Sequence, residues 1–529
     1  MSIILRRLHL GLMLAASLAL LLSFLVYLLY AINLIPFPFD YDQGEGFELQ
    51  DTVLFSQGQL PYRDTEVYPF YSSNYPPLYH ALAAPLVWIF GPAYWYGRTL
   101  SFLASLASAC VIGYAVYRDG HRHLWLAALS GLAFLASNFV YHIGPLFRQH
   151  TLMVALETAA IVILARAFPQ RDKRGIAFGL LLLICAGYTK QLAAITAVAA
   201  LAWMFLRQPR AALRWAAGFI GFGALIFLWL NLASDGHWWT QTIVANVNQF
   251  HPLQAFGLLA LWFQLHGFLL VPAGLLMFYE TYFDRLSIYA IWFCFAALVG
   301  GIASGTWGAG DSYFTSSIAA ACILSGICLS RSLKAAWRSP PQLQRVLGQV
   351  NGAAWPILLL VPLLYLGYAR ATLKMPTHGA FAPLANLLGV EPNTRESFYD
   401  SASFDVPGYA NIGYFVSEED EIAGRRIVDL IKASDRPVLS EDASFAFAAN
   451  REVVSNPTQL RNLYLAGSFR GDRLIEMIET HQFGLVILRA QFYPTPVLEA
   501  IGRAYQHWRT IRMNRFDYLI LRPKHGATE

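Results

Sequence analysis

The residues best suited to chemistry are carboxylates near the N-terminus of an otherwise apolar chain. Segment 39–80 contains Asp40, Asp42, Glu45, Glu48, Asp51, Asp64 and Glu66, although only 13% of all residues are charged. Asp42 and Glu45 are close enough in sequence for local structure to bring both carboxylates toward one point. Such a carboxylate can act as a general base that removes a proton from an attacking hydroxyl. We therefore take Asp42 and Glu45 as candidate catalytic residues, whereas Asp64 and Glu66 lie in a polar connector and are interpreted as solvated.

Cations and polar side chains at the ends of later apolar stretches form the second group of candidates. Lys190 lies between two apolar runs in CAGYTKQLAAIT, and Arg98 and Arg148 lie at the ends of others. A helix-end arginine can extend to lipid headgroups without any function, but charged groups at membrane depth usually mark a functional site. We expect these three cations to contact a phosphate. Gln191 beside Lys190 is a further candidate for substrate binding, and Asn248, Asp311 and Tyr313 are weaker candidates for sugar or acceptor contacts.

The composition is that of a membrane protein that crosses the bilayer several times. Of 529 residues, 56% are hydrophobic, and the mean hydropathy is +0.43, whereas soluble domains carry about a quarter charged residues. The net charge of +5 comes from basic residues in short loops beside apolar stretches, so no nucleic-acid partner is expected. The five cysteines lie inside apolar runs with no CxxC pair, which predicts neither disulfides nor a cysteine metal site. We assign no cofactor or metal, and metal dependence stays open.

Eleven apolar stretches are long enough to be predicted membrane spans. They lie near residues 9–33, 98–117, 124–142, 151–166, 175–190, 191–206, 215–233, 256–279, 286–304, 313–330 and 352–370. The first lacks an evident cleavage site and is predicted to be a retained anchor. The stretch 75–88 is also apolar, but Pro-Pro and Gly-Pro bracket it, so we interpret it as a helix lying in the interface.

The distribution of basic residues predicts the orientation of these spans. With a cytoplasmic N-terminus, the short inner loops hold most of the Lys and Arg residues of the first 371 positions, as the positive-inside rule requires. The outer side before residue 371 has only Arg63, Arg98, Arg148, Lys190 and Arg370. The candidate site residues therefore gather at the outer ends of the spans.

From about residue 371 the composition becomes that of a soluble domain. Helical patterns at 421–431, 472–480 and 496–508 alternate with β-type runs at 437–439, 452–454, 485–488 and 517–521, which is typical of a small α/β domain. An odd number of spans places this domain outside the cell. We predict a mainly α, polytopic transmembrane helical bundle over 1–371, with a first outer loop at 34–97, followed by an extracytoplasmic α/β domain over 372–529.

The order of several short motifs resembles that of the GT-C glycosyltransferases. An N-terminal span is followed by the acidic loop, GQLPYRD, YPPLYH and GRTLSFLAS, an order similar to the protein O-mannosyltransferases and the bacterial aminoarabinose transferases. TKQ at 189–191 and GAGDSYF at 308–314 resemble less characterised bacterial members. The resemblance covers roughly residues 1–371. It implies a multi-pass enzyme that uses polyprenyl-phosphate sugars, usually with inversion at the anomeric carbon and with the base in the first outer loop.

One departure from that family concerns the base itself. Its members often have two adjacent acidic residues in the first outer loop, whereas this chain has Gly44-Glu45 with Asp42 two residues earlier. Which carboxylate is the base is therefore open. His150 stands where several relatives have an acidic residue, so no acceptor or metal role is transferred to it.

The predicted function is sugar transfer from a polyprenyl-phosphate donor on the outer face of a bacterial plasma membrane. The expected partners are this donor, the membrane lipids and an acceptor that is a lipid, a glycan or a protein. A transporter or flippase of a lipid-linked substrate is the alternative, favoured by Glu157 inside a predicted span. A noncatalytic membrane subunit whose C-terminal domain binds a partner is a second alternative. The sugar and the oligomeric state stay open.

Overall fold

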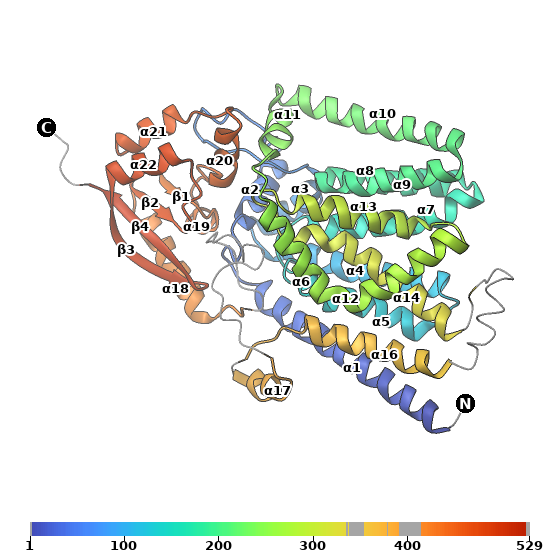
Figure 1. The fold of residues 1–529 in the computed structure, drawn as a ribbon. Coiled ribbons are helices and arrows are strands. Elements are labelled where there is room, and N and C mark those ends of the chain that lie inside the picture. Colours follow the sequence, from blue (N-terminus) through green and yellow to red (C-terminus); the bar gives the residue numbers. More distant parts are fainter. Residues whose placement is uncertain (1–2, 335–336, 338–353, 378, 391–413, 525–529) are drawn as a thin grey trace.

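Long apolar helices pack into a bundle, and a smaller part built around one β-sheet lies at one end of it (Figure 1). The computed structural model describes residues 3–334, 337, 354–377, 379–390 and 414–524. The first described turn of α1 (Ile3–Leu34) lies at the end of the bundle that faces away from the sheet (Figure 1). The first and the last described residues are therefore on opposite sides of the molecule.

The predicted spans fall on the long helices of the bundle, except that the span predicted at 124–142 is interrupted, because α5 ends at Ala136 and the short helix α6 (Asn138–Tyr141) follows. These helices are α1 (Ile3–Leu34), α4 (Trp95–Asp119), α5 (Leu124–Ala136), α7 (His150–Gln170), α8 (Lys173–Thr189), α9 (Ala194–Arg207), α10 (Pro209–Ala233), α12 (Pro252–Phe283), α13 (Ile288–Ala303), α14 (Thr315–Leu333) and α16 (Ala354–Thr372). Of the span predicted at 352–370, the first two residues lie outside the described part. Within the described part of the chain, six helices are long and apolar enough to cross a membrane. The chain is thus a multi-pass membrane protein, and the count of eleven spans stays a prediction.

The amount of burial differs strongly between the helices of the bundle. In the most apolar 18-residue stretch of Asp311–Leu333, 94% is buried inside the protein. The sequence of this helix, TSSIAAACILSGICLS, is rich in Ala, Ser and Gly. Small residues let neighbouring helices approach closely, which is the usual basis of helix packing in membranes. By contrast, α10 is only 6% buried in the corresponding window and lies at the edge of the bundle (Figure 1). Its Phe, Leu and Trp side chains are suited to lipid.

The connection between α1 and α4 folds at the end of the bundle nearest the sheet. It contains α2 (Glu45–Ser56) and α3 (Leu78–Phe90), which pack against each other. Helix α2 starts directly after Gly44, whose φ of 99° is in the region that favours glycine. Helix α3 has 13 residues, the same length as α5. Its position in the membrane interface therefore stays a prediction.

Short helical segments from other parts of the chain complete this end of the bundle. They are α6 (Asn138–Tyr141), η1 (Gln191–Ala193), α11 (His237–Thr242), η2 (Val244–Asn246) and η3 (Asp311–Phe314). Each follows or precedes a long helix, so the polar residues at helix ends are brought together. After α16, η5 (Gly379–Phe381) and α17 (Ala382–Leu387) lead toward the C-terminal part.

The C-terminal part contains a four-stranded sheet in the order β1-β2-β4-β3. Its strands are β1 (Val438–Ser440), β2 (Leu485–Leu488), β3 (Tyr505–Met513) and β4 (Phe516–Pro523), and its helices are α18 (Glu418–Lys432), α19 (Ser444–Ala449), α20 (Pro457–Leu465), α21 (Asp472–Glu479) and α22 (Thr495–Ala504). Strands β1 and β2 pair in parallel, and β4 pairs antiparallel with both β2 and β3. The predicted α/β character is confirmed for the described residues, whereas the domain boundary stays a prediction that includes 391–413 and 525–529, outside the described part.

Two local predictions in this part are wrong. Residues 452–454 form no strand; Val453 and Val454 are instead buried in hydrophobic clusters. The helix predicted over 496–508 ends at Ala504, and the chain continues as β3. The reason is that β4 pairs antiparallel with the residues from Tyr505 to Met513, and pairing between strands overrides local helix propensity.

Candidate active site

A cavity of about 450 Å³ lies where the bundle meets the C-terminal part. Its walls come from α2, from the polar residues that precede α3, α7 and α9, from η2 and η3, and from α20. The volume is in the range of small-ligand pockets. Both carboxylates and cations line it, so it is suited to a polar, anionic ligand.

Five of the residues predicted from the sequence line this cavity. They are Arg148, Lys190, Gln191, Asn248 and Tyr313. The Nζ atom of Lys190 lies 2.5 Å from Nε2 of His150 and 4.8 Å from the centre of the Tyr75 ring. Lys190 is only 5% exposed, so its ammonium group is held against the cavity wall.

The two amides in the cavity wall are oriented by backbone carbonyls. Gln191 Nε2 donates to the carbonyl oxygen of Asn74 at 2.8 Å and to that of Thr242 at 3.1 Å. Asn248 Nδ2 donates to the carbonyl oxygen of Trp307 at 3.1 Å. Because both amide nitrogens are used, the amide oxygens are the groups that can accept a hydrogen bond from a ligand hydroxyl.

Glu45 forms a buried ion pair with Arg98 outside the cavity lining. Nε and Nη2 of Arg98 donate to the two carboxylate oxygens at 3.0 and 2.9 Å. The same carboxylate accepts from the backbone N–H groups of Tyr41, Asp42 and Phe147. These donors, with Arg98 first among them, outweigh the cost of burial and lower the pKa of Glu45.

Arg98 also holds the chain between α1 and α2. Its Nη1 group donates to the carbonyl oxygens of Leu34 and Phe37, and its Nη2 group donates to that of Phe39. All five N–H groups of the guanidinium are therefore used within the protein. The side chain is fully buried and does not line the cavity, and its contacts hold the first loop in place.

Asp42 lies at the edge of the cavity and pairs with one of its cations. Asp42 Oδ2 accepts from Nη2 of Arg148 at 2.8 Å, and Arg148 also donates to the carbonyl oxygen of Gln43. Gln43 and Gly44, directly after Asp42, line the cavity. Asp311, another residue predicted from the sequence, does not line the cavity. Its buried carboxylate lies 3.7 Å from Nδ1 of His142.

Two carboxylates that line the cavity were not selected from the sequence. Glu48 and Asp51 are both 2% exposed, and burial raises the pKa of Glu48 to about 8 and that of Asp51 to about 7. Their spacing of three residues places them on one face of α2. This spacing is a signal that could have identified them, but only if a helix starting at Glu45 had been expected.

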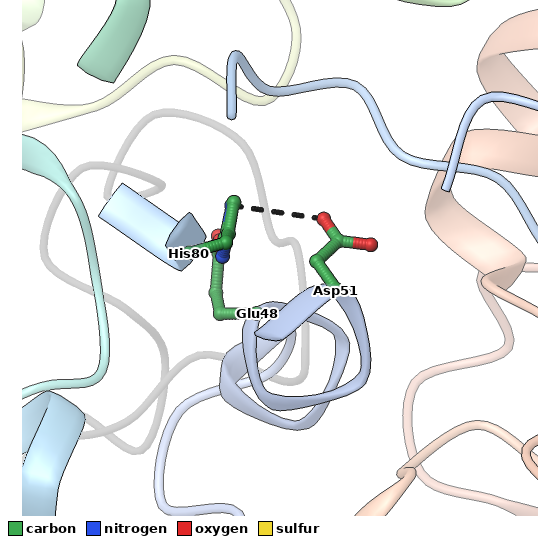
Figure 2. A group of neighbouring side chains, drawn as sticks. All are labelled: Glu48, Asp51 and His80. Carbon is green, nitrogen blue, oxygen red and sulfur yellow. Dashed lines mark ion pairs between the residues drawn. The ribbon is translucent and has the colours of Figure 1, made fainter. Parts of the chain in front are cut away.

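The same pair of carboxylates lies beside a histidine from α3. Figure 2 shows Glu48, Asp51 and His80 converging on one point. One ligand atom from each lies within 4.8 Å of the other two. Among the described residues, this is the group whose side chains are arranged to hold a metal ion.

The C-terminal part also contributes to the cavity, which no local sequence signal indicated. Asn456, Thr458 and Asn462 line it. Thr458 Oγ1 accepts from Nε2 of Gln43 at 3.0 Å, so α20 is fixed against the first loop beside the candidate base. The cavity therefore depends on residues more than 400 positions apart in sequence.

Comparison with known proteins identifies the fold through structure alone. No protein-family model and no curated protein sequence matches this chain. The crystal structure of ArnT from Cupriavidus metallidurans in the apo state superposes with a TM-score of 0.56 at 12% identity, covering 94% of this chain and 97% of ArnT. The structure of the same protein bound to undecaprenyl phosphate gives the same values. The chain has the GT-C fold.

A second, more distant similarity supports this assignment of the fold. The oligosaccharyltransferase of Archaeoglobus fulgidus in the apo form superposes with a TM-score of 0.50 at 12% identity, covering 96% of this chain and 74% of that protein. The similarity to ArnT includes nearly the whole of both chains. The GT-C likeness therefore extends beyond the roughly 371 residues over which the motifs resemble that family.

Proposed function

We propose that this protein is a GT-C glycosyltransferase that transfers a sugar from a polyprenyl-phosphate donor to an acceptor hydroxyl. The observation that carries the proposal is the cavity in which Arg148 and Lys190 face carboxylates of the first loop. The ArnT fold supports it, because ArnT has been crystallised with undecaprenyl phosphate. By analogy, the phosphate of a polyprenyl donor is the anion that these two cations are suited to bind.

Asp42 is the base in this proposal. Its carboxylate removes the proton of the acceptor hydroxyl while the hydroxyl oxygen attacks the anomeric carbon from the face opposite the phosphate. The bond between the anomeric carbon and the phosphate oxygen breaks, and the phosphate leaves with both bonding electrons. Arg148 and Lys190 stabilise the charge that develops on it. This geometry inverts the anomeric centre.

Asp42 is preferred over Glu45 because the two carboxylates have different partners. Glu45 accepts two hydrogen bonds from Arg98 and three from backbone N–H groups. A base buried in that manner has no oxygen directed at a substrate. Asp42 lies next to the cavity and is paired with Arg148, a proposed phosphate ligand, so it is placed beside the reacting bond. Glu45 and Arg98 act as positioning residues.

The remaining cavity residues are assigned to the sugar and the acceptor. The side-chain oxygens of Gln191 and Asn248 can accept from sugar hydroxyls, and the Tyr313 ring lies 5.8 Å from Nζ of Lys190, where it can pack against a sugar. The site faces the outer leaflet of a bacterial plasma membrane in the proposed orientation, with a cytoplasmic N-terminus and an extracytoplasmic domain over 372–529. Acceptor contacts from Asn456 and Asn462 explain why the C-terminal part lines the cavity.

The test is release of free polyprenyl phosphate by the full-length protein in lipid nanodiscs supplied with a panel of polyprenyl-phosphate sugars and acceptors. Asp42→Asn is expected to lower turnover at least about a hundredfold while donor binding persists. Asp64→Asn is the matched control, because Asp64 is exposed and accepts only a local backbone hydrogen bond. Full turnover in Asp42→Asn contradicts the assignment of the base.

A transporter or flippase is the alternative function, and Glu157 is the feature that favoured it. In the structure Glu157 is buried within α7 and accepts from Oγ of Ser316 at 2.6 Å. It does not belong to the cavity lining. This alternative would be favoured if the protein binds the donor but cleaves it with no acceptor in the panel, and if it moves the donor between the leaflets of a vesicle.

A further inference from the structure

The group formed by Glu48, Asp51 and His80 has the composition of a metal site. Both carboxylates project from one face of α2, and the imidazole reaches them from α3 (Figure 2). The three residues are at most 2% exposed. Arg148 Nη1 lies 3.5 Å from Oε1 of Glu48 and compensates part of the charge of this group, and a bound cation would compensate the rest.

Two atoms of this group lack hydrogen-bond partners among the residues that the structure describes. They are Oε2 of Glu48 and Nε2 of His80. Each is directed toward the other at a distance of 3.3 Å, and His80 Nε2 lies 3.7 Å from Oδ2 of Asp51. Buried polar atoms without partners are rare in native proteins and often indicate a ligand.

The separations between these atoms agree with coordination of one ion. Zinc bound to nitrogen and carboxylate oxygen has bond lengths of about 2.0–2.2 Å, so neighbouring ligand atoms in a tetrahedral site are separated by roughly 3.4 Å. The measured 3.3 and 3.7 Å are close to this value. Tyr71 donates to Asp51 Oδ1 at 2.8 Å and Ser73 donates to Oδ2, which fixes the carboxylate as outer-shell partners do in metal sites.

Two of the three side chains border the cavity. Glu48 and Asp51 line it, whereas His80 does not. Three protein ligands with one open position toward a cavity is the arrangement of zinc sites that also bind a water or a substrate oxygen. Mixed imidazole and carboxylate ligands suit Zn²⁺ or Mn²⁺ better than Mg²⁺ or Ca²⁺.

We propose that Glu48, Asp51 and His80 bind one divalent transition-metal ion, Zn²⁺ or Mn²⁺, in the wall of the cavity with an open coordination position facing it. The binding site does not depend on the proposed sugar transfer. If that transfer occurs, the ion adds a positive charge to the cavity wall and can bind an anionic oxygen of the ligand.

The experiment measures binding of the metal alone. Full-length protein in nanodiscs is treated with a chelator, and Zn²⁺ and Mn²⁺ are then titrated by calorimetry, with bound metal counted by elemental analysis. The wild type is expected to bind one equivalent at this site. Glu48→Gln and Asp51→Asn keep the side-chain shape and are expected to weaken binding about tenfold or more, and His80→Ala is expected to abolish it.

His507→Ala is the matched control, because His507 is exposed on β3 and reports adventitious binding to a surface imidazole. Each variant is compared by size exclusion so that loss of metal is not confused with loss of fold. The proposal is overturned if the wild type binds no metal equivalent that His80→Ala lacks, if Asp51→Asn binds the metal as tightly as the wild type, or if His507→Ala loses the same equivalent. Metal binding without sugar transfer leaves this inference intact and counts only against the proposed function.

Discussion

Replacing Glu45 with Gln separates a positioning role from a catalytic one. The substitution keeps the size of the side chain but removes the charge that compensates Arg98, which is fully buried with all its N–H groups directed at Glu45 and three backbone carbonyls. Removing one partner of a buried ion pair typically costs about 3–5 kcal/mol. At about 2 °C per kcal/mol for a large domain, we expect the midpoint of thermal unfolding to fall by roughly 6–10 °C.

The assay compares thermal unfolding in nanodiscs with donor turnover at a temperature well below both transitions. The control is Glu421→Gln, which breaks an exposed pair with Arg425; surface pairs contribute only about 0–1 kcal/mol, so this midpoint should move by less than roughly 2 °C. The double variant Glu45→Gln/Arg98→Met should lose less stability than the sum of the single variants, because the two residues interact directly.

One outcome refutes this reasoning directly. If Glu45→Gln unfolds at the wild-type temperature but has lost turnover, Glu45 is the base and Asp42 is not. If both the midpoint and the turnover are unchanged, the ion pair with Arg98 does not support the first loop. The predicted result is a less stable protein that keeps measurable turnover when folded.

The other predictions concern packing, donor binding and the alternative function. Gly46→Ala is expected to destabilise the protein by about 1–3 kcal/mol, because its Cβ would lie 2.8 Å from the carboxylate oxygens of Asp40; Gly187→Ala, with nothing within 4 Å, should leave the unfolding midpoint unchanged or slightly raised. Lys190→Gln is expected to raise KM for the polyprenyl-phosphate donor about tenfold, since a charge-assisted hydrogen bond contributes about 1.5–3 kcal/mol; an unchanged KM in steady-state kinetics would exclude Lys190 as a phosphate ligand. Glu157→Gln should keep donor turnover within about threefold, because its carboxylate is used by a serine hydroxyl outside the cavity; loss of lipid movement with intact donor binding would support a transporter.

Local pattern was enough to predict the helical bundle. Uninterrupted apolar runs leave the backbone only the helix as a way to satisfy its hydrogen bonds in lipid, so the positions of the long helices follow from composition. The prolines before α3 likewise indicated a short separate helix, and Lys190 was identified because a cation between two apolar runs needs a polar environment. All of these signals lie within about twenty neighbouring residues.

The roles of the first-loop carboxylates depended on tertiary structure. Glu45 and Asp42 are equivalent in the sequence, and only the approach of Arg98 to one and Arg148 to the other distinguishes them. In the same way, the spacing of Glu48 and Asp51 alone does not indicate a metal site. The structure shows the group because α3 places His80 beside both carboxylates (Figure 2).

The C-terminal contribution to the cavity and the strand β3 were also decided by contacts between distant segments. Asn456 and Thr458 have no unusual sequence context, yet α20 packs against the first loop and places them in the cavity wall. Strand β3 exists because β4 pairs with it along its length. The sequence by itself therefore determined which segments enter the membrane and where polar groups gather, since both follow from local hydrophobicity. Which polar groups meet was decided by the folding of segments that are hundreds of residues apart.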